Sequence, residues 1–255
     1  MQTKIRVGAV SYQNTKPLIY GFEHGMMKEE IELKIDFPSK IASMLLEDEI
    51  DVGLVPVAVI PEMKEHHIIS DYCIGCDGEV ASVCLFSEVP IENVSKILLD
   101  YQSRTSVELV RILIKEFWKI DPVLEQPTDE YISRISGTTA ALLIGDRALR
   151  QRKNSAYIYD LGLEWKKFAG LPVVFAAWVS NKRLGDAFIE SFNNANAYGL
   201  NNLNLVLGAN PYNFFELKDY YTRYINYHMD AGKQIALKRF LKKMKLMHKS
   251  NEINI

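Results

Sequence analysis

The sequence predicts an α/β protein of two lobes, and three observations support this prediction. Short apolar runs alternate with amphipathic segments throughout the 255 residues, as expected for layered strands and helices. A new strand–helix unit begins at about Ser87, and an apolar run at 173–179 leads back from it. We therefore expect a discontinuous first lobe, 1–86 and 179–255, and an inserted second lobe, 87–178, joined by two hinge strands.

Composition narrows the class of protein. Hydrophobic residues make up 48% of the chain and charged residues 24%, which is enough apolar material for a sizeable core. The net charge of −2 argues against a nucleic-acid partner. The start of the chain enters a strand pattern directly, and no apolar run reaches transmembrane length, so we expect a cytoplasmic protein without stable membrane insertion.

The three cysteines do not form a recognisable metal site. Cys73 and Cys76 make a single C-x-x-C, and Cys84 stands alone. A structural zinc site needs about four ligands, and neither a second pair nor a suitable histidine spacing follows. A redox C-x-x-C usually opens a helix, whereas a turn is predicted here around Gly78. We expect reduced thiols and no metal or cofactor, with a metal or redox role as the alternative.

The first element is a strand over 4–7, and Pro17 marks the start of a helix. The turn between them would bring polar groups to the carboxyl edge of a sheet, where α/β proteins bind ligands. The free N–H groups at the helix start favour anions. The alternative is an ordinary polar loop that caps a helix. The candidate ligand-binding residues of this turn are Ser11, Tyr12, Asn14 and Thr15.

The next elements are predicted from alternation and from proline. Residues 31–37 alternate as a strand, and Ser39 is expected to cap a helix that contains 41–45. The apolar run 51–57 is typical of a buried parallel strand. Its end, at Val55, is a second candidate for ligand contact.

Two further strands are predicted before the lobes change. Residues 68–74 form one, and residues 80–86 form a buried strand with the hydroxyl of Ser82 inside it. Ser82 is a candidate ligand-binding residue. The alternative is that Ser82 only bonds a neighbouring backbone group, as serine often does.

The second lobe begins with a strand at 96–100, a polar loop and a long helix. Thr105 and Glu108 match a capping box. The loop carries more hydroxyl groups than one cap needs, so we favour an anion site over a solvated cap. Its candidate residues are Ser103, Arg104, Thr105 and Ser106.

The remaining elements complete the alternation. A buried strand at 140–144 ends at Gly145 and Asp146, which are further candidates for the ligand site. Residues 158–161 precede an amphipathic segment around Trp165 and Phe168, and another apolar strand follows at 173–179. The basic amphipathic stretch 234–249 reads as a covering helix with a solvated face, although such helices can also lie on membranes.

Several stretches together resemble the chorismate dehydratases of the futalosine route to menaquinone. They are S-Y-x-N-T-K-P-L at 11–18, D-V-G-L-V-P at 51–56, Ser82, S-R-T-S at 103–106, I-G-D-R-A-L at 144–149 and G-L-P-V-V-F-A-x-W at 170–178. Gln13 departs from the pattern, where leucine is usual. The resemblance implies a type II periplasmic-binding-protein-like fold with a central ligand cleft between the lobes.

It also implies a hydro-lyase that converts chorismate to 3-[(1-carboxyvinyl)oxy]benzoate and water. Asn14 is then expected to orient the reacting ring and Ser82 to bond the leaving group or a carboxylate. Asp146 is the obvious side-chain base, and the substrate's own enolpyruvyl carboxylate is another candidate.

Two other functions stay open. The sister enzyme 1,4-dihydroxy-6-naphthoate synthase shares the fold, but its catalytic histidine would fall near 144–146, where no histidine stands. The other is a non-catalytic solute-binding protein for small anions. A signal sequence or a lipoprotein cysteine near the N-terminus would favour it, and the sequence shows neither pattern.

Overall fold

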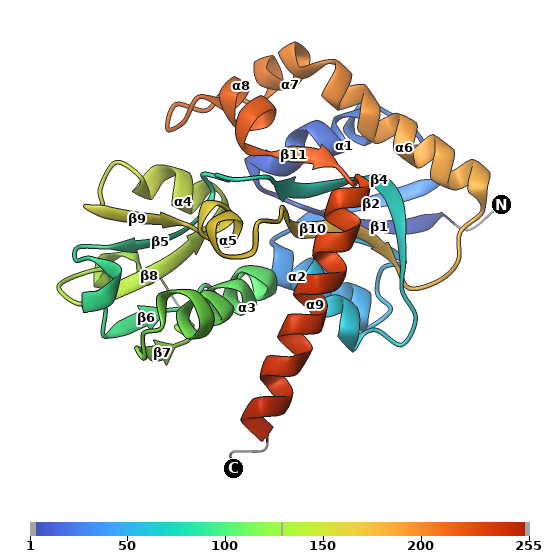
Figure 1. Ribbon diagram of the computed structural model, residues 1–255. Coiled ribbons are helices and arrows are strands. Elements are labelled where there is room, and N and C mark those ends of the chain that lie inside the picture. Colours follow the sequence, from blue (N-terminus) through green and yellow to red (C-terminus); the bar gives the residue numbers. More distant parts are fainter. Residues whose placement is uncertain (1–3, 129, 253–255) are drawn as a thin grey trace. The chain divides into compact units, whose positions relative to one another are not determined.

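The computed structural model describes residues 4–128 and 130–252. The chain divides into two compact units. Unit 1 consists of Met1–Gly75 and Phe175–Met229, and unit 2 consists of Cys76–Val174 and Asp230–Ile255. Figure 1 shows the elements of both units.

Unit 1 is built on a mixed sheet. In the described part of the chain its strand order is β11-β4-β10-β3-β1-β2. The three strands at one end of this order are parallel, since β1 pairs with both β2 and β3, whereas β10 runs antiparallel to β3, and β11 antiparallel to β4. The strand bounds are β1 Ile5–Val10, β2 Ile31–Asp36, β3 Val52–Pro56, β4 His67–Cys76, β10 Val173–Ser180 and β11 Asn226–His228.

The helix that follows β1 is α1 (Lys16–Glu23), and it packs closely against α6 (Asp186–Asn201) (Figure 1). A Cβ on Gly21 would collide with the carbonyl oxygen of Ala195, and one on Gly199 with that of Pro17. Glycine is needed at both positions because the two backbones touch. The helices of unit 1 are η1 Gln13–Thr15, α1 Lys16–Glu23, α2 Pro38–Leu46, η2 Val57–Glu62, α6 Asp186–Asn201, α7 Leu203–Ala209, α8 Leu217–Asp219 and η6 Tyr220–Tyr224.

Unit 2 has a second sheet, with the described strands in the order β7-β6-β8-β5-β9. β5 runs antiparallel to β8 and β9, and β6 runs parallel to β7 and β8. The strands are β5 Val83–Ser87, β6 Lys96–Leu98, β7 Val123–Glu125, β8 Thr139–Ile144 and β9 Tyr157–Asp160. The helices are η3 Ile91–Asn93, α3 Arg104–Ile112, η4 Leu113–Trp118, η5 Ile132–Arg134, α4 Gly145–Gln151, α5 Leu161–Ala169 and α9 Ala231–Glu252.

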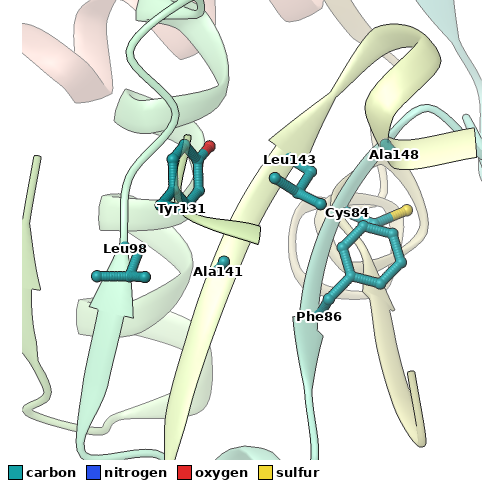
Figure 2. Packing of buried hydrophobic residues seen from close by; sticks show 7 residues of the cluster. All are labelled: Cys84, Phe86, Leu98, Tyr131, Ala141, Leu143 and Ala148. Atoms are coloured by element: carbon teal, nitrogen blue, oxygen red, sulfur yellow. The ribbon is translucent and has the colours of Figure 1, made fainter. Parts of the chain in front are cut away.

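Alternate residues of β5, β6 and β8 build the buried core on one face of this sheet (Figure 2). Tyr131 belongs to this core. Its buried hydroxyl donates to the Leu142 carbonyl at 2.7 Å, so this polar group has a hydrogen-bond partner. The members of the cluster are Cys84, Phe86, Leu98, Tyr131, Ala141, Leu143 and Ala148.

The lobe boundaries differ from those that the sequence predicts. β5 belongs to unit 2 because it pairs with β8 and β9. α9 also belongs to unit 2: the Phe240 ring lies 6.1 Å from the Trp165 ring, and Lys243 pairs with Glu116. The chain passes between the units within β4, within β10 and after Met229. Strand pairing of β5 and side-chain packing of α9, rather than position along the chain, decide which unit holds these segments.

The start of α2 and the state of the cysteines can be compared with the sequence expectations. Ser39 does not cap α2, which begins at Pro38 with Phe37 in the N-cap position. Proline suits the first turn of a helix because its missing N–H would be unpaired there. The three cysteines are buried free thiols. Across residues 4–128 and 130–252, no group of three or more metal-ligating side chains is found, and no helix is long and apolar enough to cross a membrane.

Candidate functional site

In unit 1, the predicted ligand turn lies at the carboxyl end of β1. The Ser11 N–H donates to the Asp36 carbonyl at the end of the neighbouring β2, at 3.0 Å. Ser11 is exposed, Tyr12 and Asn14 are half-buried, and Thr15 is fully buried. The Thr15 hydroxyl donates to Oδ1 of Asn14 at 3.3 Å. The turn therefore brings the four predicted residues together at one edge of the sheet.

Two tyrosines from the C-terminal part of unit 1 support this turn. The Tyr227 hydroxyl donates to the backbone carbonyl of Asn14 at 2.9 Å, and the Tyr221 hydroxyl to Oε1 of Gln13 at 3.2 Å. Burial raises the pKa of Tyr227 well above its ordinary value, so this hydroxyl keeps its proton and remains a donor. Sequence reasoning missed both tyrosines, and the run of tyrosines over 220–227 is the signal that could have indicated them.

Val55 lies in β3, one residue from its end, and pairs with Ala177 of β10. Its side chain is fully buried. The parallel pairing of β1 with β3 brings the end of this strand to the same edge of the sheet as the Ser11–Thr15 turn, as expected for neighbouring parallel strands.

In unit 2, Ser82 lies in a turn before β5 rather than inside the predicted strand. Its N–H donates to the Val80 carbonyl at 2.7 Å, and its carbonyl accepts from the Gly145 N–H at 2.8 Å. Ala81 between them has φ +62°, which breaks the extended conformation that a strand needs. The turn thus brings two predicted residues, Ser82 and Gly145, into direct backbone contact.

The buried carboxylate of Asp160 holds this turn through hydrogen bonds. Asp160, at the end of β9, accepts hydrogen bonds from the N–H groups of Val80 and Ala81 and from those of Gly162 and Leu163. Burial raises the pKa of Asp160, and the backbone donors oppose that shift. Sequence reasoning missed Asp160, because nothing local links it to Ser82.

The start of α3 differs in one respect from the prediction. The N-cap residue is Ser103, whose Oγ accepts from the Ser106 N–H at 3.1 Å and donates to the Ser106 hydroxyl at 2.8 Å. Thr105 is therefore the second residue of the helix and not its cap. Glu108 does not close a capping box with Thr105; its carboxylate lies 2.8 Å from His248 Nε2.

Asp100 connects α3 to the start of α4. Its buried carboxylate accepts from the N–H of Gln102 at 2.8 Å, from the N–H of Ile144 at 3.0 Å and from Nη2 of Arg147 at 2.8 Å. Burial raises the pKa of Asp100 while the Arg147 charge opposes that shift. Asp100 therefore bonds residues that flank both predicted sets, 103–106 and 145–146, and sequence reasoning also missed it.

A family described as menaquinone biosynthesis matches residues 5–245. The chain belongs to this family. Within the curated proteins, the chain is 25% identical over 261 residues to a chorismate dehydratase of Thermus thermophilus, covering 92% of this chain and 93% of the relative.

The fold of this menaquinone-biosynthesis protein is also found in solved structures. A protein of Archaeoglobus fulgidus, AF1704, is 18% identical with a TM-score of 0.72, covering 96% of this chain and 98% of the other. The periplasmic aliphatic sulphonate binding protein SsuA of Escherichia coli is 13% identical with a TM-score of 0.62, covering 98% and 94%. These likenesses confirm the predicted periplasmic-binding-protein-like fold.

The predicted site residues form one set in each unit: Ser11, Tyr12, Asn14, Thr15 and Val55 in unit 1, and Ser82, Ser103–Ser106, Gly145 and Asp146 in unit 2. The unit 1 set offers hydroxyl and amide side chains beside the start of α1. The unit 2 set offers hydroxyls at the start of α3 and the half-buried carboxylate of Asp146. Helix N-termini with hydroxyl groups suit oxyanions such as carboxylates.

Proposed function

We propose that the protein is a chorismate dehydratase, a carbon–oxygen lyase of menaquinone biosynthesis that acts in the cytoplasm. The observation that carries this proposal is the similarity, over nearly the full length of both chains, to the Thermus thermophilus chorismate dehydratase, within a menaquinone-biosynthesis family. Hydroxyl groups beside helix starts in both units support it, because the substrate carries two carboxylates.

The proposed reaction removes the C3 proton and the C4 hydroxyl of chorismate. The electron pair of the C3–H bond completes the aromatic ring, the C4–O bond breaks, and the products are 3-[(1-carboxyvinyl)oxy]benzoate and water. Aromatisation drives the reaction, so the protein must chiefly orient the ring, accept a proton and support the leaving hydroxyl.

Each proposed role belongs to a residue of the two sets. Asn14 orients the reacting ring, and Ser82 hydrogen-bonds the leaving group or a carboxylate. Ser103–Ser106 and the turn residues Ser11 and Tyr12 bind the carboxylates, Thr15 holds the Asn14 side chain, and Val55 and Gly145 shape the surroundings. The base is the enolpyruvyl carboxylate of the substrate, with Asp146 as the side-chain alternative.

The test is incubation of the purified protein with chorismate, without added metal or nucleotide, and mass spectrometry of the products. We expect chorismate to be consumed and an aromatic product 18 mass units lighter to appear, with a chelator having no effect. Binding of chorismate without consumption would favour the solute-binding alternative. Activity lost to the chelator and restored by zinc would contradict the metal-free mechanism.

A further inference from the structure

Asp160 does more than end a strand. Its side chain is 4% exposed, and it occupies the N-cap position of α5, where Oδ1 accepts from the N–H groups of Gly162 at 3.0 Å and Leu163 at 3.2 Å. A helix cap needs one acceptor oxygen. The second carboxylate oxygen is therefore available for another structural task.

That oxygen holds the turn that leads to Ser82. Oδ2 accepts from the Ala81 N–H at 2.8 Å, and the Val80 N–H is shared between Oδ1 at 3.1 Å and Oδ2 at 3.2 Å. Nη1 of Arg152 donates to the Ala81 carbonyl at 3.2 Å and lies 3.9 Å from the same carboxylate oxygen. The N–H and the carbonyl of Ala81 are thus held by the buried Asp160 carboxylate and by the half-buried Arg152 guanidinium.

The conformation that this pair holds is an uncommon one. Ala81 has φ +62°, and a residue with a Cβ pays for this left-handed conformation unless the surroundings fix it. Directly after it, the Ser82 carbonyl accepts the Gly145 N–H at 2.8 Å. The Asp160 carboxylate consequently fixes the backbone from which the Ser82 side chain extends.

We propose that Asp160 is a positioning residue for the reaction, acting through the Ser82 turn. The inference rests on the proposed function, in which Ser82 contacts the substrate. Positioning errors of about 1 Å can lower a rate by roughly 10²-fold. The proposal therefore predicts a defect in turnover that exceeds any defect in binding or folding.

Asp160→Asn is the test variant, because it separates the two tasks of the side chain. The amide oxygen can still cap α5, since asparagine and aspartate are comparable caps. The amide nitrogen would then face the Ala81 N–H, and two donors cannot bond each other. Glu164→Gln is the matched control, since Glu164 is a buried acid of α5 that bonds Trp118 and Lys167 instead of the turn.

We expect Asp160→Asn to lower kcat on chorismate by about 10²-fold while KM changes by less than about 3-fold. Glu164→Gln should keep kcat within about 3-fold of the wild type. If Asp160 acts through Ser82, the double variant with Ser82→Ala should be no slower than Ser82→Ala alone. Equal kcat losses in Asp160→Asn and Glu164→Gln, or fully additive losses in the double variant, would overturn the proposal.

A second measurement does not depend on the substrate. Amide hydrogen exchange should be faster at Ala81 and Gly145 in Asp160→Asn than in the wild type and in Glu164→Gln, with Gly162 unchanged. Unchanged protection at Ala81 and Gly145 would overturn the inference even if the wild type proved inactive on chorismate. Inactivity of the wild type, with the expected exchange pattern, would instead contradict only the proposed function.

Discussion

Asn14 is held in unit 1 through both its backbone and its side chain. The Tyr227 hydroxyl binds its carbonyl, and the Thr15 hydroxyl binds its side-chain oxygen. Among the described residues, the amide nitrogen of Asn14 takes part in no such bond. An amide donor on this half-buried side chain suits the orienting role proposed for it.

Asn14→Asp should remain folded and lose most of its activity. Aspartate has nearly the same shape and still accepts from Thr15, but it lacks the amide donors and adds a charge that repels a dianionic substrate. We expect kcat/KM on chorismate to fall by roughly 10²-fold or more. The measurement is a chorismate-consumption assay beside a thermal melt of the same preparation. Asn154→Asp, at an exposed position, adds the same charge and should keep full activity; equal activity in both variants would reduce Asn14 to a structural residue.

Residue types and spacing were sufficient to find the polar turns, but they did not identify the residues that hold these turns in place. The Ser103–Ser106 loop was predicted as a helix start, yet two hydroxyl residues could each serve as its cap, and only the Ser106 N–H identifies Ser103. The supports Tyr227 and Asp160 lie 213 and 80 residues from the groups they bind. Local pattern carries no information about contacts at that separation.

At the scale of elements, apolar runs predicted where most strands lie, but they predicted the first and last residues of the strands less well. The predicted strand over 68–74 is β4, but the predicted strand over 80–86 begins only at Val83. The left-handed Ala81 causes this difference, and alanine gives no sign of that conformation in a sequence. A buried Asp160 imposes it from another strand.

The end of the α3–η4 helical segment offers a prediction about stability. Lys119 is exposed and has φ +54°, the left-handed conformation that ends helices and favours glycine. Lys119→Gly should therefore raise the free energy of unfolding by about 0.5–1 kcal/mol. The control is Lys115→Gly, at an exposed position inside the same segment, which should lower it by about 1 kcal/mol. Urea unfolding of both variants and the wild type measures the difference; a loss of stability in Lys119→Gly would contradict this account.

At the scale of the whole chain, the α/β class and the two-unit division follow from the alternation of patterns. The assignment of segments to units does not, because β5 and α9 join unit 2 through partners far away in the sequence. The prediction of a covering helix is consistent with α9, which contacts the rest of unit 2 through Phe240 and Lys243.

Asp51 connects three segments of unit 1 that are distant in sequence. Its buried carboxylate accepts from the backbone and side chain of Arg6 on β1 and from Lys182 beyond β10. Its own carbonyl accepts from the Ser180 hydroxyl at 3.0 Å. Burial raises the pKa of Asp51, but the hydrogen bonds from Arg6 and Lys182 outweigh it and hold the pKa well below the ordinary value.

This lowered pKa predicts how stability depends on pH. A carboxylate whose pKa is lower in the folded state contributes its stability above the unfolded-state pKa of about 4 and loses it as pH falls toward the folded value. Asp51→Asn should therefore lower the free energy of unfolding by about 1–3 kcal/mol at pH 7, and the gap from the wild type should narrow between pH 5 and pH 3. Urea unfolding at these three pH values measures the gap. Asp121→Asn, at an exposed position, should differ from the wild type by less than about 0.5 kcal/mol throughout. A gap for Asp51→Asn that stays constant from pH 7 to pH 3 would mean that the charge of Asp51 does not stabilise the junction of these segments.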